Sequence, residues 1–108
     1  MLITIKVSDF WMLEEILGQL IFDEDKIPYL MDYSRNGWVE IEVELKGEYK
    51  WRRREIEDFE VLFDDIDIGG IIDSHNPQIY HNLEAKYITY KLDCSWYDKR
   101  QQYNMIGF

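Results

Sequence analysis

The chain has 108 residues, 46% of them hydrophobic and 16% aromatic, which predicts a single folded domain over residues 1–108 and excludes wholesale disorder. Its 12 lysines and arginines against 22 aspartates and glutamates give a net charge of −10, so direct binding of nucleic acid is not expected. No apolar run is long enough to span a bilayer, and the single cysteine, Cys94, excludes an internal disulfide. We therefore expect a protein of the reducing cytoplasm with no membrane partner.

The first elements follow from the spacing of apolar residues. Leu2–Val7 alternates like a strand, and Ser8 or Asp9 is placed to cap a helix that begins near Phe10. The next apolar segment, Ile27–Met31, is too short to distinguish helix from strand. An acidic loop is expected between these two segments.

The clearest strand signal is Trp38–Leu45, where apolar and acidic residues alternate strictly. Gly47 predicts a hairpin turn after it, with Tyr49–Arg54 as the returning strand. A three-residue loop would place all apolar residues of the hairpin on one face, because a one-residue slip would reverse every side chain. The same register sets three glutamates opposite three cations, namely Glu44 opposite Lys50, Glu42 opposite Arg52 and Glu40 opposite Arg54. The arginine cluster is therefore expected to be neutralised within its own hairpin.

The second half of the chain predicts three more elements. Alternation over residues 58–63 indicates a strand, and Asn76–Pro77 is typical of the start of a short helix, here ending near Leu83. Alternation over residues 85–96 indicates a last long strand with Cys94 on its inward face. Together the elements predict an α+β fold, with a mostly antiparallel sheet of four to five strands and one N-terminal helix packed on a face.

Nearly all of the charge imbalance lies in residues 55–85. This segment contains no lysine or arginine and nine acids: Glu55, Glu57, Asp58, Glu60, Asp64, Asp65, Asp67, Asp73 and Glu84. Acids on one face of a strand recur about every 6.8 Å, whereas a DNA strand carries a phosphate about every 3.4 Å. A phosphate-like surface therefore requires the acidic turn at residues 64–67 to fold beside the strand. The expected contacts with lysines and arginines of a partner are Glu57, Asp58, Glu60, Asp64, Asp65, Asp67 and Asp73.

A solvated acidic face that only keeps the protein soluble is the alternative interpretation of this segment. A metal site is a weaker hypothesis, although His75 and His81 follow the acids. Counted from Asp65, the fifth position of a calcium loop is Gly69 and the twelfth is Asn76, which breaks that pattern. No nucleophile elbow, phosphate-binding loop or zinc-protease motif occurs in the sequence. We therefore expect no catalytic residue, no metal and no cofactor.

These observations favour a small non-enzymatic binding protein that occupies a basic surface of a partner protein, such as a nucleic-acid-handling enzyme. Anti-CRISPR and anti-restriction inhibitors act in this way as a class, and the comparison rests on size and charge, not on matching residues. An alternative hypothesis is an assembly subunit, such as a homodimer, that self-associates through a strand edge and its hydrophobic tail, residues 101–108. A third hypothesis, a metal-dependent enzyme, predicts that metal remains bound after purification.

Overall fold

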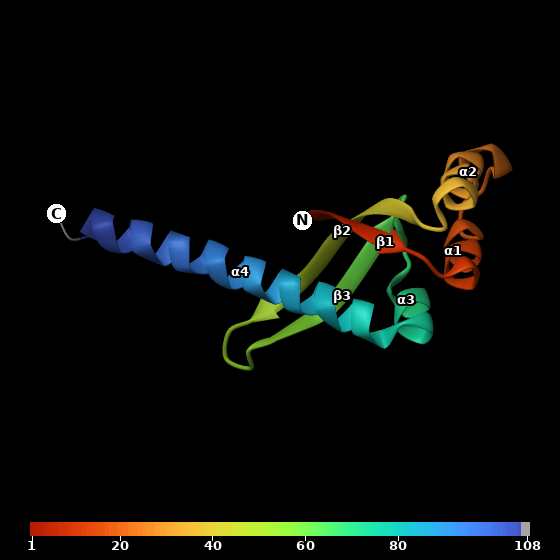
Figure 1. Cartoon of the computed structure of the whole chain (residues 1–108). Helices are drawn as coiled ribbons and strands as arrows, with labels where there is room; N and C mark the ends of the chain where they lie inside the picture. The colour runs from red at the N-terminus through yellow and green to blue at the C-terminus, as the bar shows by residue number, and fades with distance from the viewer. Residues whose placement is uncertain (107–108) are drawn as a thin grey trace.

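The protein is built from one antiparallel sheet and four helices. A computed structural model describes the backbone of residues 1–106 and the side chains of residues 1–92. The elements in chain order are β1 (Leu2–Val7), α1 (Phe10–Leu17), the 3₁₀ turn η1 (Asp23–Asp25), α2 (Ile27–Asn36), β2 (Val39–Lys50), β3 (Glu55–Phe63), β4 (Ile66–Asp67), α3 (Gly69–His75) and α4 (Pro77–Ile106). The strands lie in the order β1-β2-β3-β4, and α4 crosses the sheet (Figure 1). The predicted α+β fold with a small antiparallel sheet is confirmed.

The first strand and helix form as the sequence predicts. Asp9 caps α1, and its carboxylate accepts hydrogen bonds from the backbone N–H groups of Trp11 at 2.9 Å and Met12 at 3.3 Å. One arc of the helix, Met12, Leu13, Ile16 and Leu17, is buried in the core. Phe10, the first residue of α1, lies outside this arc, and its exposed ring lies 5.5 Å from the ring of Tyr33 on α2.

The ambiguous segment Ile27–Met31 is the first half of α2. This helix ends at Gly37, which caps it with a φ of 79°, a conformation that glycine adopts readily. On the side of α2 that faces the rest of the protein, the ring of Tyr29 packs edge-on against the ring of Phe63, with the ring centroids 5.6 Å apart. On the same side, the hydroxyl of Tyr33 donates a hydrogen bond to the carbonyl of Ser8 at 3.4 Å.

The alternating pattern of β2 is confirmed, because its inward residues Val39, Ile41, Val43 and Leu45 are almost completely buried. The predicted hairpin register is wrong. The chain does not turn at Gly47 but continues to Lys50, and residues 51–54 form the turn. Lys50 pairs with Glu55. The outer glutamates Glu40, Glu42 and Glu44 lie opposite Lys6, Thr4 and Leu2 of β1, not opposite the expected Arg54, Arg52 and Lys50.

Gly47 is required for close packing and not for a turn. It lies at a bulge where the register between β2 and β3 shifts, and Asp58 on the opposing strand has a φ of 55°. A Cβ atom at Gly47 would lie 2.7 Å from Cγ2 of Ile56 and 3.3 Å from Cα of Phe59. The carbonyl of Gly47 also accepts a hydrogen bond from the hydroxyl of Tyr87 at 3.0 Å, which fixes α4 on the sheet.

The last predicted strand is wrong, because residues 85–96 belong to α4. The helix begins at Pro77 as expected, but it continues to Ile106 instead of ending near Leu83. Leu83 and Tyr87, four residues apart, are its buried positions, while Tyr90 and Leu92 are exposed. The expected inward position of Cys94 and the docking of the tail concern side chains outside the described residues. A helix of this length extends about 45 Å, and α4 projects beyond the sheet, away from α1 and α2 (Figure 1).

Candidate functional site

The acids of residues 55–85 are distributed over β3, the turn after it, β4, α3 and α4. Glu55 and Glu57 lie at the hairpin end of β3, where Arg53 approaches them to 3.7 and 3.3 Å and Lys50 approaches Glu57 to 3.9 Å. The nine residues of β3 place this end about 27 Å from Phe63 at the other end. Asp58 lies in the bulge near the hairpin end, and Glu60 is exposed between the two ends. The acids of β3 are therefore spread along the whole strand, and those at its hairpin end lie beside cations.

The side chain of Asp67 is engaged in hydrogen bonds that stabilise the fold. Its Oδ1 accepts hydrogen bonds from the backbone N–H groups of Val61 at 3.2 Å and Gly69 at 2.9 Å, which tie β3 to the start of α3. Burial raises the pKa of the nearby Tyr80, and the charges of Glu84, Asp67 and Asp73 raise that pKa further. These three acids therefore gather around Tyr80, apart from the hairpin end of β3.

Asp64 and Asp65 form the two-residue turn between β3 and β4. Phe63 pairs with Ile66 across this turn, and the two aspartates have φ values of 51° and 63°. Two successive left-handed residues are typical of a type I′ turn, in which asparagine followed by glycine is preferred. Two aspartates adopt this conformation less readily, and they place two exposed negative charges side by side.

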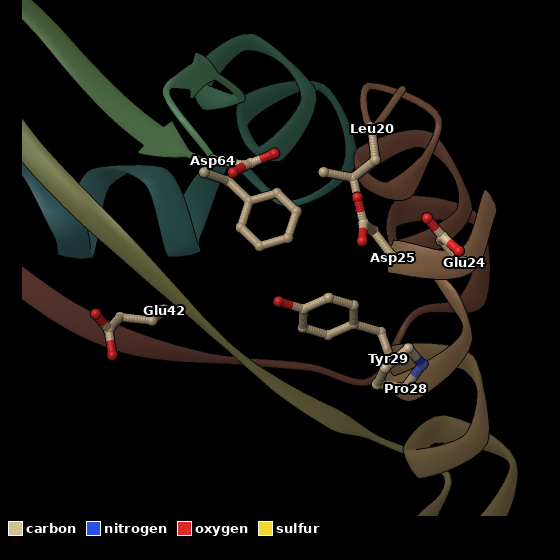
Figure 2. Close-up of a pocket in the computed structure, with 8 residues that line it drawn as sticks. Leu20, Glu24, Asp25, Pro28, Tyr29, Glu42 and Asp64 are labelled. Carbon is tan, nitrogen blue, oxygen red and sulfur yellow. The ribbon is translucent and has the colours of Figure 1, made fainter. Parts of the chain in front are cut away.

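Asp64 also lines an open cavity of about 490 Å³ whose other walls come from η1, α2 and β2. The lining includes four carboxylates together with the ring of Tyr29 (Figure 2); the acids are Glu24, Asp25, Glu42 and Asp64. Burial raises the pKa of Tyr29, and the charges of Asp64, Asp25 and Glu42 raise it further, so the cavity is electronegative. An adjoining hollow is lined by Glu42, Asp64 and Asp65.

We call Glu24, Asp25, Glu42, Asp64 and Asp65 the acidic surface. Among residues 1–92, whose side chains are described, none of the five has a lysine, arginine or histidine nitrogen within 4.0 Å of its carboxylate. Glu44, close by, differs because Lys46 approaches it to 3.9 Å. The acidic surface therefore carries negative charge that no described side chain neutralises.

The site lies where β3 has ended but the neighbouring strand β2 continues. β3 pairs with β2 only from Glu44 onward, so in the described backbone residues 39–43 of β2 pair with β1 alone. Tyr29 fills part of the space left beside β2, and its ring contacts Phe63 where β3 ends. Sequence reasoning found Asp64 and Asp65 but missed Glu24, Asp25 and Glu42, because their approach depends on where β3 stops. The strict alternation of β2 showed only that Glu42 points outward.

Within residues 1–92, no group of three or more histidine, cysteine, aspartate or glutamate side chains is arranged to hold a metal ion. His75 on α3 is instead paired with Glu15 on α1. None of the described helices is both long enough and apolar enough to cross a bilayer. Comparison with protein-family models, with curated proteins and with solved structures found no match to this chain.

Proposed function

We propose that the protein is a non-enzymatic binding protein whose acidic surface occupies a lysine- and arginine-rich surface of a partner protein. The observation that carries this proposal is the approach of five carboxylates from three chain segments with no cation among the described side chains beside them. Like charges that line one cavity repel one another, and they do so more strongly where water is partly excluded. A cationic partner would relieve this repulsion, whereas the isolated fold does not.

The partner class follows from the same charge. A negative surface on a chain of net charge −10 raises the rate of encounter with a basic protein, from about 10⁵–10⁶ to as much as 10⁸–10⁹ M⁻¹s⁻¹ at low salt. Grooves rich in lysine and arginine are typical of enzymes that handle nucleic acid. The proposed role is inhibition by occupying such a groove, as anti-CRISPR and anti-restriction proteins do, and this comparison is one of size and charge alone.

The proposed contacts change from those expected from the sequence. Asp64 and Asp65 remain, and Glu24, Asp25 and Glu42 join them because they line the same cavity as Asp64. Glu57 contributes less, since Arg53 and Lys50 already lie within 4 Å of it. Exposed ion pairs of this kind are weak, but they reduce the net charge offered to a partner.

The test compares two double variants with the same change in charge. Asp64→Asn/Asp65→Asn removes two charges from the acidic surface, and Glu55→Gln/Glu57→Gln removes two beside Arg53. Each protein is immobilised and exposed to lysate of the native host, and bound protein is eluted with a salt gradient or with double-stranded DNA. We expect wild type and the glutamine variant to retain one partner that both salt and DNA release, and the asparagine variant to lose it. Equal capture by a folded asparagine variant would contradict the proposal.

A second candidate function is an assembly subunit that self-associates. The projection of α4 beyond the sheet favours it, because a helix that leaves its own core offers a long surface to another chain (Figure 1). This function predicts oligomers that persist at high salt and disappear when residues 101–108 are deleted. Light scattering at low and high salt distinguishes it from the first proposal, which predicts salt-sensitive binding to a different protein.

A further inference from the structure

Helix α2 has apolar residues on two sides, and none of its residues is fully buried. Tyr29 and Tyr33 face the body of the protein. Ile27, Leu30 and Met31, spaced three and four residues apart on another side of the helix, are 51%, 39% and 56% exposed. This aliphatic side is not needed to hold α2 in place, because the two tyrosines make that contact.

Two further large apolar residues are exposed in the segment before α2. Ile21 and Phe22 are 86% and 59% exposed, and the single turn η1 separates them from Ile27. We call Ile21, Phe22, Ile27, Leu30 and Met31 the apolar surface. Their exposed fractions amount to about three whole side chains, or about 600 Å² at about 200 Å² for each. This area approaches the roughly 800 Å² that each partner contributes to a standard interface.

The charges within and beside this surface indicate what covers it. The turn η1, between its two parts, consists of Asp23, Glu24 and Asp25, of which the last two also line the acidic cavity. Lys26 is bound to Asp23 at 3.1 Å, and Arg35 lies in the last turn of α2. A second copy would bring these acids against their own counterparts, and an anionic bilayer would be repelled in the same way. Charge complementarity therefore favours a cationic protein partner.

We infer that the apolar surface anchors an amphipathic segment of the partner, one that presents large apolar side chains flanked by lysine or arginine. The inference rests on the proposed function, because the cations beside the apolar side chains would meet Glu24 and Asp25. The two surfaces then have different tasks. The acidic surface accelerates association, whereas the apolar surface slows dissociation, because buried apolar contacts form only after docking.

The test uses a named probe, an amphipathic helical peptide of leucine and lysine with a length of about five helical turns. Two control peptides have the same pattern, one with glutamate in place of lysine and one with glutamine in place of leucine. The test variant is Ile21→Ser/Met31→Ser, and the matched control is Leu92→Ser, which changes an exposed leucine on α4. We expect the leucine–lysine peptide to bind wild type and Leu92→Ser alike and to bind the double variant about tenfold more weakly, through faster dissociation. Neither control peptide should bind comparably.

Each other outcome rejects either the inference or the proposed function, and the variants show which. Equal affinity of wild type and Ile21→Ser/Met31→Ser for the leucine–lysine peptide would show that the apolar surface does not anchor it. Loss of a wild-type dimer in the double variant, seen by sedimentation, would assign the surface to a second copy. Loss of binding to phosphatidylserine vesicles would assign it to a membrane. If only Asp64→Asn/Asp65→Asn slows binding of the leucine–lysine peptide, the inference fails and the proposed function stands. If only Ile21→Ser/Met31→Ser weakens binding of the peptide, the proposed function fails.

Discussion

The turn at Asp64 and Asp65 allows the acidic surface to be tested through the stability of the isolated protein. We expect Asp64→Asn/Asp65→Gly to stabilise the fold, because asparagine and glycine adopt the observed φ values of 51° and 63° more readily than aspartate. A left-handed conformation costs an ordinary L-residue about 1–2 kcal/mol, and aspartate somewhat less. Glycine offsets part of the gain by increasing the entropy of the unfolded chain by about 0.5–1 kcal/mol.

The expected net stabilisation is about 1 kcal/mol, which raises the melting temperature by about 4–8 °C in a domain of this size. Urea unfolding followed by tryptophan fluorescence measures it, with an unchanged denaturant slope as evidence that the compactness of both states is preserved. Asp58→Gly is the matched control, since Asp58 has a φ of 55° but lies outside the acidic surface. Both variants should be stabilised, and only the turn variant should lose partner binding. An unchanged or lower stability of the turn variant would refute the reasoning about the turn, and retained binding would refute its link to function.

Three further predictions concern the fold and the acidic cavity. Asp67→Ala should lower the free energy of unfolding by about 2 kcal/mol, because a carboxylate that accepts two backbone N–H bonds is lost, and Asp67→Asn should recover part of it in urea unfolding. Gly47→Ala should cost about 1–3 kcal/mol in the same assay, because the added Cβ would lie 2.7 Å from Cγ2 of Ile56. Asp64→Asn should lower the raised pKa of Tyr29 toward its ordinary value, as an NMR titration of tyrosine ring carbons would show. Because Tyr29 ionises less readily in the folded state than in the unfolded one, stability should fall as the pH rises above about 10.

A specific result would contradict the prediction made for each variant. Full stability of Asp67→Ala would mean that its two hydrogen bonds are replaced by water. Full stability of Gly47→Ala would mean that the bulge relaxes without cost. A Tyr29 pKa unchanged in Asp64→Asn would mean that the carboxylate of Asp64 does not act on the cavity.

The elements set by neighbouring residues were predictable from the sequence. Asp9 capped α1, the alternation of β2 identified its inward face, and Pro77 began α4. The hairpin turn was wrongly predicted at Gly47, because glycine occurs at sites of close packing as well as in turns. Only the register with β3 distinguishes the two. Residues 85–96 were wrongly predicted as a strand, because exposed apolar residues such as Tyr90 and Leu92 produced a two-residue alternation within a helix.

The candidate site was only half predictable. The concentration of acids in residues 55–85 pointed to the turn at Asp64 and Asp65, which stays in the candidate site. It did not reveal that Glu57 lies beside cations, since that depends on where the hairpin turns. It also did not reveal Glu24, Asp25 and Glu42, which approach the turn only after α2 has packed against the end of β3. A net charge is a property of composition, whereas a charged surface depends on the fold.

The most direct test of the acidic surface is the rate at which wild type and Asp64→Asn/Asp65→Asn associate with the partner captured from the host, measured by stopped flow at low and high salt. We expect wild type to associate much faster at low salt, and the two proteins to converge at high salt because screening removes the contribution of the two charges. Equal association rates at low salt, with both proteins folded, would contradict the claim that these carboxylates guide the protein to its partner.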